Sequence, residues 1–199
     1  MISYLEWAAN AVFVLSVVLA ARNNINTWWT GIIGCGLFAV LFYQYNLYAD
    51  VTLMIFFIFT SVYGWTYWGA KKELHAIQRT PVTAFINLVL LAALATVAYG
   101  WILHSSTDAY APFIDSIILM FSVLAQFLLM QRRVETWVCW LIVDTVAVPL
   151  YASRELYLTS FVYGLFWCNA WFGLYTWIKL YKKEKSGADK WPTNPIAAD

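Results

Sequence analysis

The sequence predicts an all-α integral membrane protein with seven transmembrane helices. Of its 199 residues, 62% are hydrophobic and only 12% are charged, whereas a soluble domain carries about 25% charged residues to cover its surface. Apolar segments long enough to cross a bilayer, about 20 residues each, recur along the chain. The basic residues fall almost entirely between alternate segments, which is typical of a polytopic membrane protein.

Seven apolar segments account for most of the chain. Because their connections are short, residues 1–181 form a single transmembrane domain with no room for a soluble one. Residues 182–199 are polar and contain Gly and Pro, so we expect a cytoplasmic tail without regular structure. The segments cover about residues 4–21, 28–46, 51–69, 83–103, 115–131, 134–153 and 157–179.

The distribution of Lys and Arg predicts the orientation. One side of the membrane would hold eleven of the 12 basic residues, and the other side would hold only Arg154. Because cytoplasmic loops are enriched in Lys and Arg, the C-terminus is predicted to be cytoplasmic and the N-terminus to lie outside. The eleven are Arg22, Lys71, Lys72, Arg79, Arg132, Arg133, Lys179, Lys182, Lys183, Lys185 and Lys190.

The chain contains an internal repeat with an offset of 109 residues and no gap. The repeat relates the first three segments, about 4–69, to the last three, about 115–179, in the same orientation, and the segment at about 83–103 links them. This predicts parallel three-plus-one-plus-three repeats, as in the sugar-transporting SWEET proteins, with a ligand site near the midplane between the halves. The matched residues include Thr27 with Thr136, Trp28 with Trp137, Gly64 with Gly173, and Trp68 with Trp177.

Asp144 is the one acidic residue predicted to lie deep in the membrane. Counted from Val134 at 1.5 Å per residue, it lies about 15 Å along its helix. A charged carboxylate there costs at least about 2.5–3.5 kcal/mol on insertion scales. The carboxylate therefore either faces a polar cavity that receives a ligand, or forms a hydrogen bond that only holds two helices together.

Two tryptophans accompany Asp144 on the same helix. Trp137, Trp140 and Asp144 have the spacing i, i+3 and i+7, which places them on one helical face. Their repeat counterparts in the first half are smaller, with Gly31 matching Trp140 and Cys35 matching Asp144. This asymmetry favours one ligand bound off the axis between the halves. Indole faces and one carboxylate suit a flat, aromatic and cationic ligand.

Further candidate ligand contacts lie in other segments. Trp167 is deep in the last segment, and Tyr63, in the third segment, is a further aromatic candidate. Asn169 and Gln126 are polar at mid-depth, where they either bind ligand or bond to a neighbouring helix. A further set of tryptophans is expected to form the interfacial belt, namely Trp28, Trp29, Trp65, Trp68, Trp101 and Trp177.

Other functional classes are not supported by the sequence. No nucleophile with a base, metal-binding cluster or pair of deep acids indicates an enzyme, and no metal or cofactor is expected. The three cysteines lie in apolar runs and are interpreted as packing residues. A phosphate-binding loop for ATP is also missing.

Several stretches resemble the Pnu vitamin transporters over about residues 4–180. WVCWLIVD at 137–144 is similar to the family signature W-x-x-W-x-x-x-N/D. The G-I-I-G after Trp28-Trp29, the L-Y-A-D at 47–50 and the Y-G-W-T-Y-W at 63–68 are also similar. The resemblance maps the substrate-contacting signature onto Trp137, Trp140 and Asp144.

The resemblance implies a SWEET-related fold in a bacterial inner membrane and vitamin uptake by facilitated diffusion, often as a homotrimer. A cytoplasmic kinase would act downstream without stable binding, and no nucleic-acid partner is implied. Asp at position 144 resembles the thiamine members, so thiamine is the favoured substrate and nicotinamide riboside the alternative. Riboflavin, a sugar, or a role as the substrate-binding subunit of an ATP-driven importer are less favoured.

Overall fold

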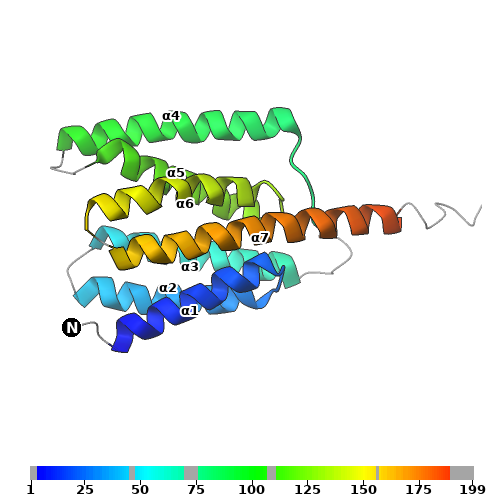
Figure 1. Ribbon diagram of the computed structural model, residues 1–199, viewed down its shortest axis with the longest axis horizontal. Coiled ribbons are helices and arrows are strands. Elements are labelled where there is room, and N and C mark those ends of the chain that lie inside the picture. The colour runs from blue at the N-terminus through cyan, green and yellow to red at the C-terminus, as the bar shows by residue number, and fades with distance from the viewer. Residues whose placement is uncertain (1–3, 45–47, 70–75, 107–110, 156, 189–199) are drawn as a thin grey trace, which may run out of the picture.

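The computed structural model describes residues 4–44, 48–69, 76–106, 111–155 and 157–188, and this part of the chain forms seven α-helices (Figure 1). The helices therefore confirm the predicted all-α class, and the last one is longer than expected. They are α1 (Tyr4–Ala21), α2 (Asn26–Gln44), α3 (Tyr48–Gly69), α4 (Val82–Ser106), α5 (Pro112–Met130), α6 (Thr136–Ser153) and α7 (Tyr157–Ala188).

Four of these helices, α1, α4, α5 and α6, are long and apolar enough to cross a membrane by length and composition. The other three helices, α2, α3 and α7, are rich in Trp, Tyr and Gly, and the stretch Asn26–Leu41 of α2 is apolar as well. These aromatic helices nevertheless run alongside the other four in one bundle (Figure 1).

Six helices form a closed ring. Going round it, each helix contacts the next in the order α1, α2, α3, α5, α6, α7 and back to α1. Helix α4 lies outside the ring against α5, at the edge of the molecule in Figure 1. The halves α1–α3 and α5–α7 therefore meet at two seams, α3 with α5 and α7 with α1.

The turns after α1 and after α5 have the same geometry, 109 residues apart. Asn23 and Arg132 both have positive φ, at 51° and 54°. The surrounding hydrogen bonds recur at the same offset: Asn24 N donates to Leu19 O at 3.0 Å and Arg133 N to Leu128 O at 2.9 Å. The hydroxyl that follows also recurs, with Thr27 Oγ1 donating to Ser16 O and Thr136 Oγ1 to Ala125 O.

A tryptophan packed on a glycine is a second contact that recurs at this offset. A Cβ added to Gly64 would lie 2.6 Å from the Trp28 ring, and one added to Gly173 would lie 2.6 Å from the Trp137 ring. Both indoles are 2% exposed. Only glycine permits this approach of α3 to α2 and of α7 to α6.

Four buried tryptophans, Trp28, Trp68, Trp137 and Trp177, form what we call the tryptophan row. Their ring centroids are 5.2 Å apart for Trp28 and Trp68, 5.9 Å for Trp68 and Trp177, and 5.6 Å for Trp137 and Trp177. The prediction that Trp28, Trp68 and Trp177 belong to the interfacial belt is wrong, because each is at most 2% exposed. Trp29, Trp65 and Trp101 are 47% to 66% exposed, as a belt requires.

A segment at residues 76–81, which we call the strap, lies against the turn between α5 and α6. Gln78 N donates to Arg132 O, and Val134 N donates to Gln78 O, both at 3.0 Å. The guanidinium of Arg132 lies 4.4 Å from the ring centroid of Trp68. Burial lowers the pKa of Arg132 from its usual value, while the charges of Glu184 and Tyr67 raise it.

The helical part of the chain ends later than predicted. Helix α7 continues to Ala188, so residues 182–188 of the predicted tail are helical. The run of Lys and Glu at 182–185 favours helix, which explains the extension. Residues 189–199, together with Lys71 and Lys72, lie outside the described residues.

Candidate functional site

The buried face of α6 carries the residues singled out by the sequence. Its buried positions include Trp137, Asp144 and Ala147, and Asp144 is only 2% exposed. The opposite face, with Val138 and Thr145, borders open grooves.

The carboxylate of Asp144 has no hydrogen-bond or ion-pair partner among the described side chains and backbone groups. The phenol of Tyr163, on α7, is close enough to interact with it electrostatically, and also interacts with Tyr151. The rings of Tyr151 and Tyr163 lie 5.0 Å apart. A carboxylate that is buried without a donor has no evident structural role, so the alternative of a helix-holding hydrogen bond loses its support.

The two tryptophans of the signature contact different parts of the interior. Trp137 belongs to the tryptophan row, and its Nε1 is buried without a hydrogen-bond partner in the described structure. Trp140 packs against the row's cluster and against a second cluster formed with α5. Buried Ala125 and Ala170, 0% and 1% exposed, belong to these two clusters. Trp140 therefore contacts both apolar clusters, one around the row and one between α5 and α6.

Gln126 and Asn169 each form a hydrogen bond across one of the two seams. Gln126 Nε2 donates to Thr60 Oγ1 at 3.3 Å across the α5–α3 seam, and Asn169 Nδ2 donates to Val17 O at 3.1 Å across the α7–α1 seam. The two pairs are repeat equivalents, since residues 17 and 60 match 126 and 169 at the 109-residue offset. The structure thus gives both amides the interhelical role that the sequence left open.

Trp167 and Tyr63 do not join the buried face of α6. Trp167 is 38% exposed and donates to Thr145 Oγ1 at 3.0 Å, on the outer side of α6 and α7. Tyr63 is 57% exposed and stacks on Tyr67. Neither residue has a contact with Asp144 among those described.

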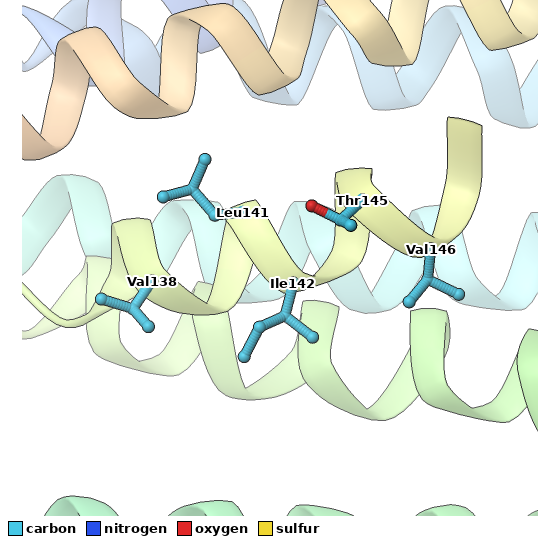
Figure 2. Close-up of a pocket in the computed structure, with 5 residues that line it drawn as sticks. All are labelled: Val138, Leu141, Ile142, Thr145 and Val146. Carbon is cyan, nitrogen blue, oxygen red and sulfur yellow. The ribbon is translucent and has the colours of Figure 1, made fainter. Parts of the chain in front are cut away.

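Two shallow grooves lie on this outer side. One, of about 290 Å³, is lined by the five α6 side chains drawn in Figure 2. The other, of about 330 Å³, includes Pro149, Gly164 and Trp167. Both linings are almost entirely apolar, so they lack the groups that would orient a polar cation.

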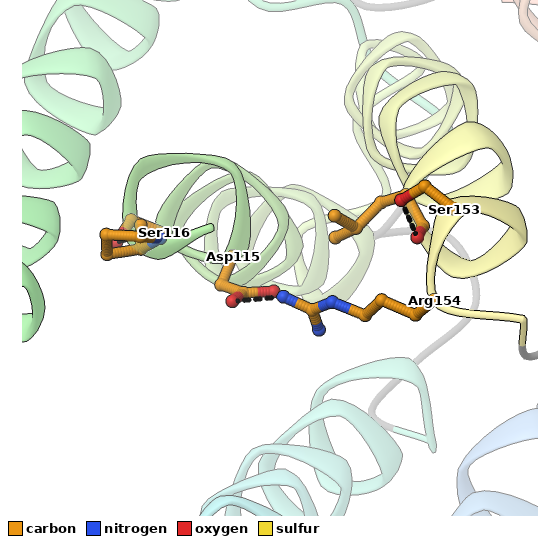
Figure 3. Close-up of polar contacts among 6 residues, drawn as sticks. Asp115, Ser116, Ser153 and Arg154 are labelled. Carbon is orange, nitrogen blue, oxygen red and sulfur yellow. Dashed lines mark hydrogen bonds and ion pairs between the residues drawn. The ribbon is translucent and has the colours of Figure 1, made fainter. Parts of the chain in front are cut away.

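An ion pair lies at the C-terminal end of α6. Arg154 Nη2 lies 2.8 Å from Asp115 Oδ2 at the start of α5 (Figure 3). Ser116 and Ser153, drawn beside it, bond to backbone carbonyls of their own helices. Arg154 is the basic residue that the sequence assigns to the side opposite the other eleven.

We expect this ion pair to contribute little to stability. Both side chains are about one-third to one-quarter exposed, and exposed pairs are worth about 0–1 kcal/mol. Asp115→Asn should therefore lower the free energy of unfolding by less than about 1 kcal/mol, measured by thermal unfolding in detergent. A loss several times larger would show that the pair locks the helix ends.

Sequence reasoning did not identify Tyr163 as a neighbour of Asp144. The spacing of Tyr163, Trp167 and Trp171 along α7 groups them in one stripe, but Tyr163 interacts with Tyr151 and Asp144, whereas Trp167 contacts Thr145 and Trp171. The described residues contain no group of three or more His, Cys, Asp or Glu that could hold a metal ion.

Comparison with known proteins places the chain in a family. The family model described as nicotinamide mononucleotide transporter matches residues 3–179. The crystal structure of the vitamin B3 transporter PnuC superimposes with a TM-score of 0.73 at 23% identity, covering 91% of this chain and 83% of that one. This structural likeness supports the fold.

Two curated relatives match most of the chain. The nicotinamide riboside transporter PnuC of Escherichia coli (strain K12) is 24% identical, over 94% of this chain and 90% of its own. The riboflavin/roseoflavin transporter RibM of Streptomyces davaonensis is 22% identical, over 86% and 83%. Because the family model spans nearly the whole sequence, this chain belongs to the nicotinamide mononucleotide transporter family and is a membrane transporter rather than an enzyme.

Proposed function

We propose that this protein carries nicotinamide riboside across the membrane and binds it inside the ring beside Asp144 and Trp140. The observation that carries this proposal is the carboxylate of Asp144, which is 2% exposed and has no hydrogen bond or ion pair among the described residues. Nicotinamide riboside is a flat cation, so the carboxylate can balance its charge and an indole can stack on its ring.

The names of the relatives favour this ligand over thiamine, which the sequence favoured. The Escherichia coli relative is a nicotinamide riboside transporter, and the carboxylate of Asp144 can balance the pyridinium charge of the riboside as it can the thiazolium charge of thiamine. Nicotinamide mononucleotide adds a phosphate, which would place negative charge near Asp144. The described Lys and Arg residues all lie at helix ends or in turns, so the nucleoside is the better match.

We also propose that the two halves are parallel repeats in the three-plus-one-plus-three, SWEET-like arrangement, with the basic end in the cytoplasm. Support comes from the contacts that recur at the 109-residue offset, in the turns at Asn23 and Arg132 and in the indoles packed on Gly64 and Gly173. In this arrangement transport is uncoupled, and net uptake depends on later consumption of the vitamin.

The identity of the substrate is tested by calorimetric titration of the purified protein. Nicotinamide riboside, nicotinamide mononucleotide, thiamine and riboflavin are compared at one salt concentration. We expect the riboside to bind most tightly and the mononucleotide at least ten-fold more weakly. Tighter binding of thiamine would restore the alternative substrate, and uptake of radiolabelled riboside into proteoliposomes without an ion gradient tests the uncoupled mechanism.

A further inference from the structure

The tryptophan row crosses the interior of the helix ring at its basic end. Helices α3 and α7 are not neighbours in the ring of helices. The indole ring centroids of Trp68 and Trp177 nevertheless lie 5.9 Å apart. Trp28 extends the row to α2, and Trp137 extends it to α6 on the opposite side. The four indoles, each at most 2% exposed, therefore fill the space through which a solute would leave the ring at this end.

The central indoles of the row also bond the two halves together. Trp68 Nε1 donates to Met130 O at 3.0 Å, across the α3–α5 seam. Trp177 Nε1 donates to Ala20 O at 3.2 Å, across the α7–α1 seam. These bonds lie at near-equivalent positions of the two seams, so the halves cannot separate at this end without breaking both.

The strap also forms contacts with α7 and with the start of α6 at this basic end. Ile77 is 2% exposed and belongs to the cluster around the row. Its amide donates to Glu184 Oε2 at 2.9 Å, which links the strap to the extension of α7. Thr80 N donates to Glu135 Oε2 at 2.8 Å, at the start of α6.

We propose that the tryptophan row, fastened by the strap, is the gate at the basic end of the transport path. It opens when Trp68 and Trp177 move apart and the strap leaves the turn at 131–135. This inference rests on the proposed function, because a gate requires that a solute pass through the ring. Trp137 then has two roles, since it is part of the gate and of the face that carries Asp144.

The gate can be locked with a reversible cross-link. Gln78 and Arg133 face each other in an isolated parallel bridge, and both are at least partly exposed to reagents. Neighbouring residues in such a bridge are close enough for a disulfide. The double variant Gln78→Cys/Arg133→Cys is made after Cys35, Cys139 and Cys168 have been replaced by Ala.

Transport is measured in proteoliposomes with whichever vitamin binds most tightly in the titration. Oxidation should lower uptake at least ten-fold, and dithiothreitol should restore it. Each single variant, Gln78→Cys or Arg133→Cys, is the matched control and should be unaffected by oxidant. Uptake that continues in fully cross-linked protein would contradict the proposed gate. Absence of uptake in the reduced protein would instead contradict the proposed function.

A second variant tests the gate without any ligand. Trp177→Phe keeps an aromatic ring but removes the Nε1 donor to Ala20 O, so it should favour the open gate. Cys35, 3% exposed on α2, serves as the reporter in a Cys139→Ala/Cys168→Ser background. A thiol reagent should label it at least ten-fold faster in Trp177→Phe than in Trp101→Phe, a control on the exposed side of α4. Equal rates would contradict the proposal.

Discussion

Replacing Asp144 with Ala is expected to abolish tight binding of the cationic vitamin and, at the same time, to stabilise the protein. The carboxylate is 2% exposed and receives no hydrogen bond from the described residues. Holding a charge at such depth costs about 2.5–3.5 kcal/mol on insertion scales, and Asp144→Ala removes that cost. Loss of one member of a buried charge pair costs about 2–5 kcal/mol of binding, or about 30-fold or more in affinity.

The two effects are measured on the same preparation, by calorimetry with nicotinamide riboside and by thermal unfolding without ligand. Thr145→Ala is the matched control, since Thr145 is the next residue and lies on the outer face of α6. It should change affinity less than three-fold. A variant Asp144→Ala that binds as wild type, or that loses stability together with binding, would mean that the carboxylate has a structural role.

Asp144→Asn separates the charge of the carboxylate from its shape. The signature that this chain resembles accepts Asn at the position, so the amide should retain binding of the riboside within about ten-fold of wild type. If Asn binds no better than Ala, then charge rather than hydrogen bonding carries recognition at this position.

The sequence predicted the helices because apolar length and periodicity are local properties of the chain. Apolar length marks α1, α4, α5 and α6 directly. Trp and Gly residues that recur at a fixed offset mark the second and third helices of each half. Asp144 was also predictable, because a lone acid in a long apolar segment is conspicuous without any tertiary information.

The environment of each tryptophan could not be predicted from depth alone. An indole near a helix end fits the bilayer interface, but it fits equally well against a glycine on a neighbouring helix. The structure places Trp28 against Gly64 and leaves the adjacent Trp29 52% exposed. A signal was present in the sequence, since Trp28 and Gly64 recur together as Trp137 and Gly173, whereas Trp29 has no tryptophan counterpart.

The roles of Gln126 and Asn169 depend on which helices become neighbours. A helical wheel gives the direction of an amide relative to its own helix, but not whether another helix or a ligand lies in that direction. The ring order of the helices places both amides at seams, where each finds a partner 3.1–3.3 Å away. The same order turns Trp167 outward to Thr145.

Gly64→Ala and Gly173→Ala should be the most destabilising single-methyl substitutions on the α3 and α7 contacts. Each new Cβ would lie 2.6 Å from carbons of a buried indole. The indole is rigid and enclosed, so the helices must shift to admit the methyl group. Overpacking of this kind costs about 1–3 kcal/mol, occasionally more, and we expect losses at the upper end of that range for both variants.

Gly36→Ala and Gly164→Ala are the controls, because an added Cβ at either position meets nothing within 4 Å. They should be neutral or slightly stabilising, since Ala favours helix more than Gly does by about 1 kcal/mol. Free energies of unfolding are obtained from denaturant titrations in mixed micelles. Gly173→Ala as stable as Gly164→Ala would contradict the packing of Trp137 on α7.

The same pair of glycines also tests whether the two halves are built alike. If the contacts are equivalent, Gly64→Ala and Gly173→Ala lose similar stability, and a smaller ring relieves each of them. Combining Gly64→Ala with Trp28→Phe, or Gly173→Ala with Trp137→Phe, should cost less than the sum of the single losses, because each pair shares one contact. Additive losses in one half and coupled losses in the other would show that the recurring geometry does not have a common energetic basis.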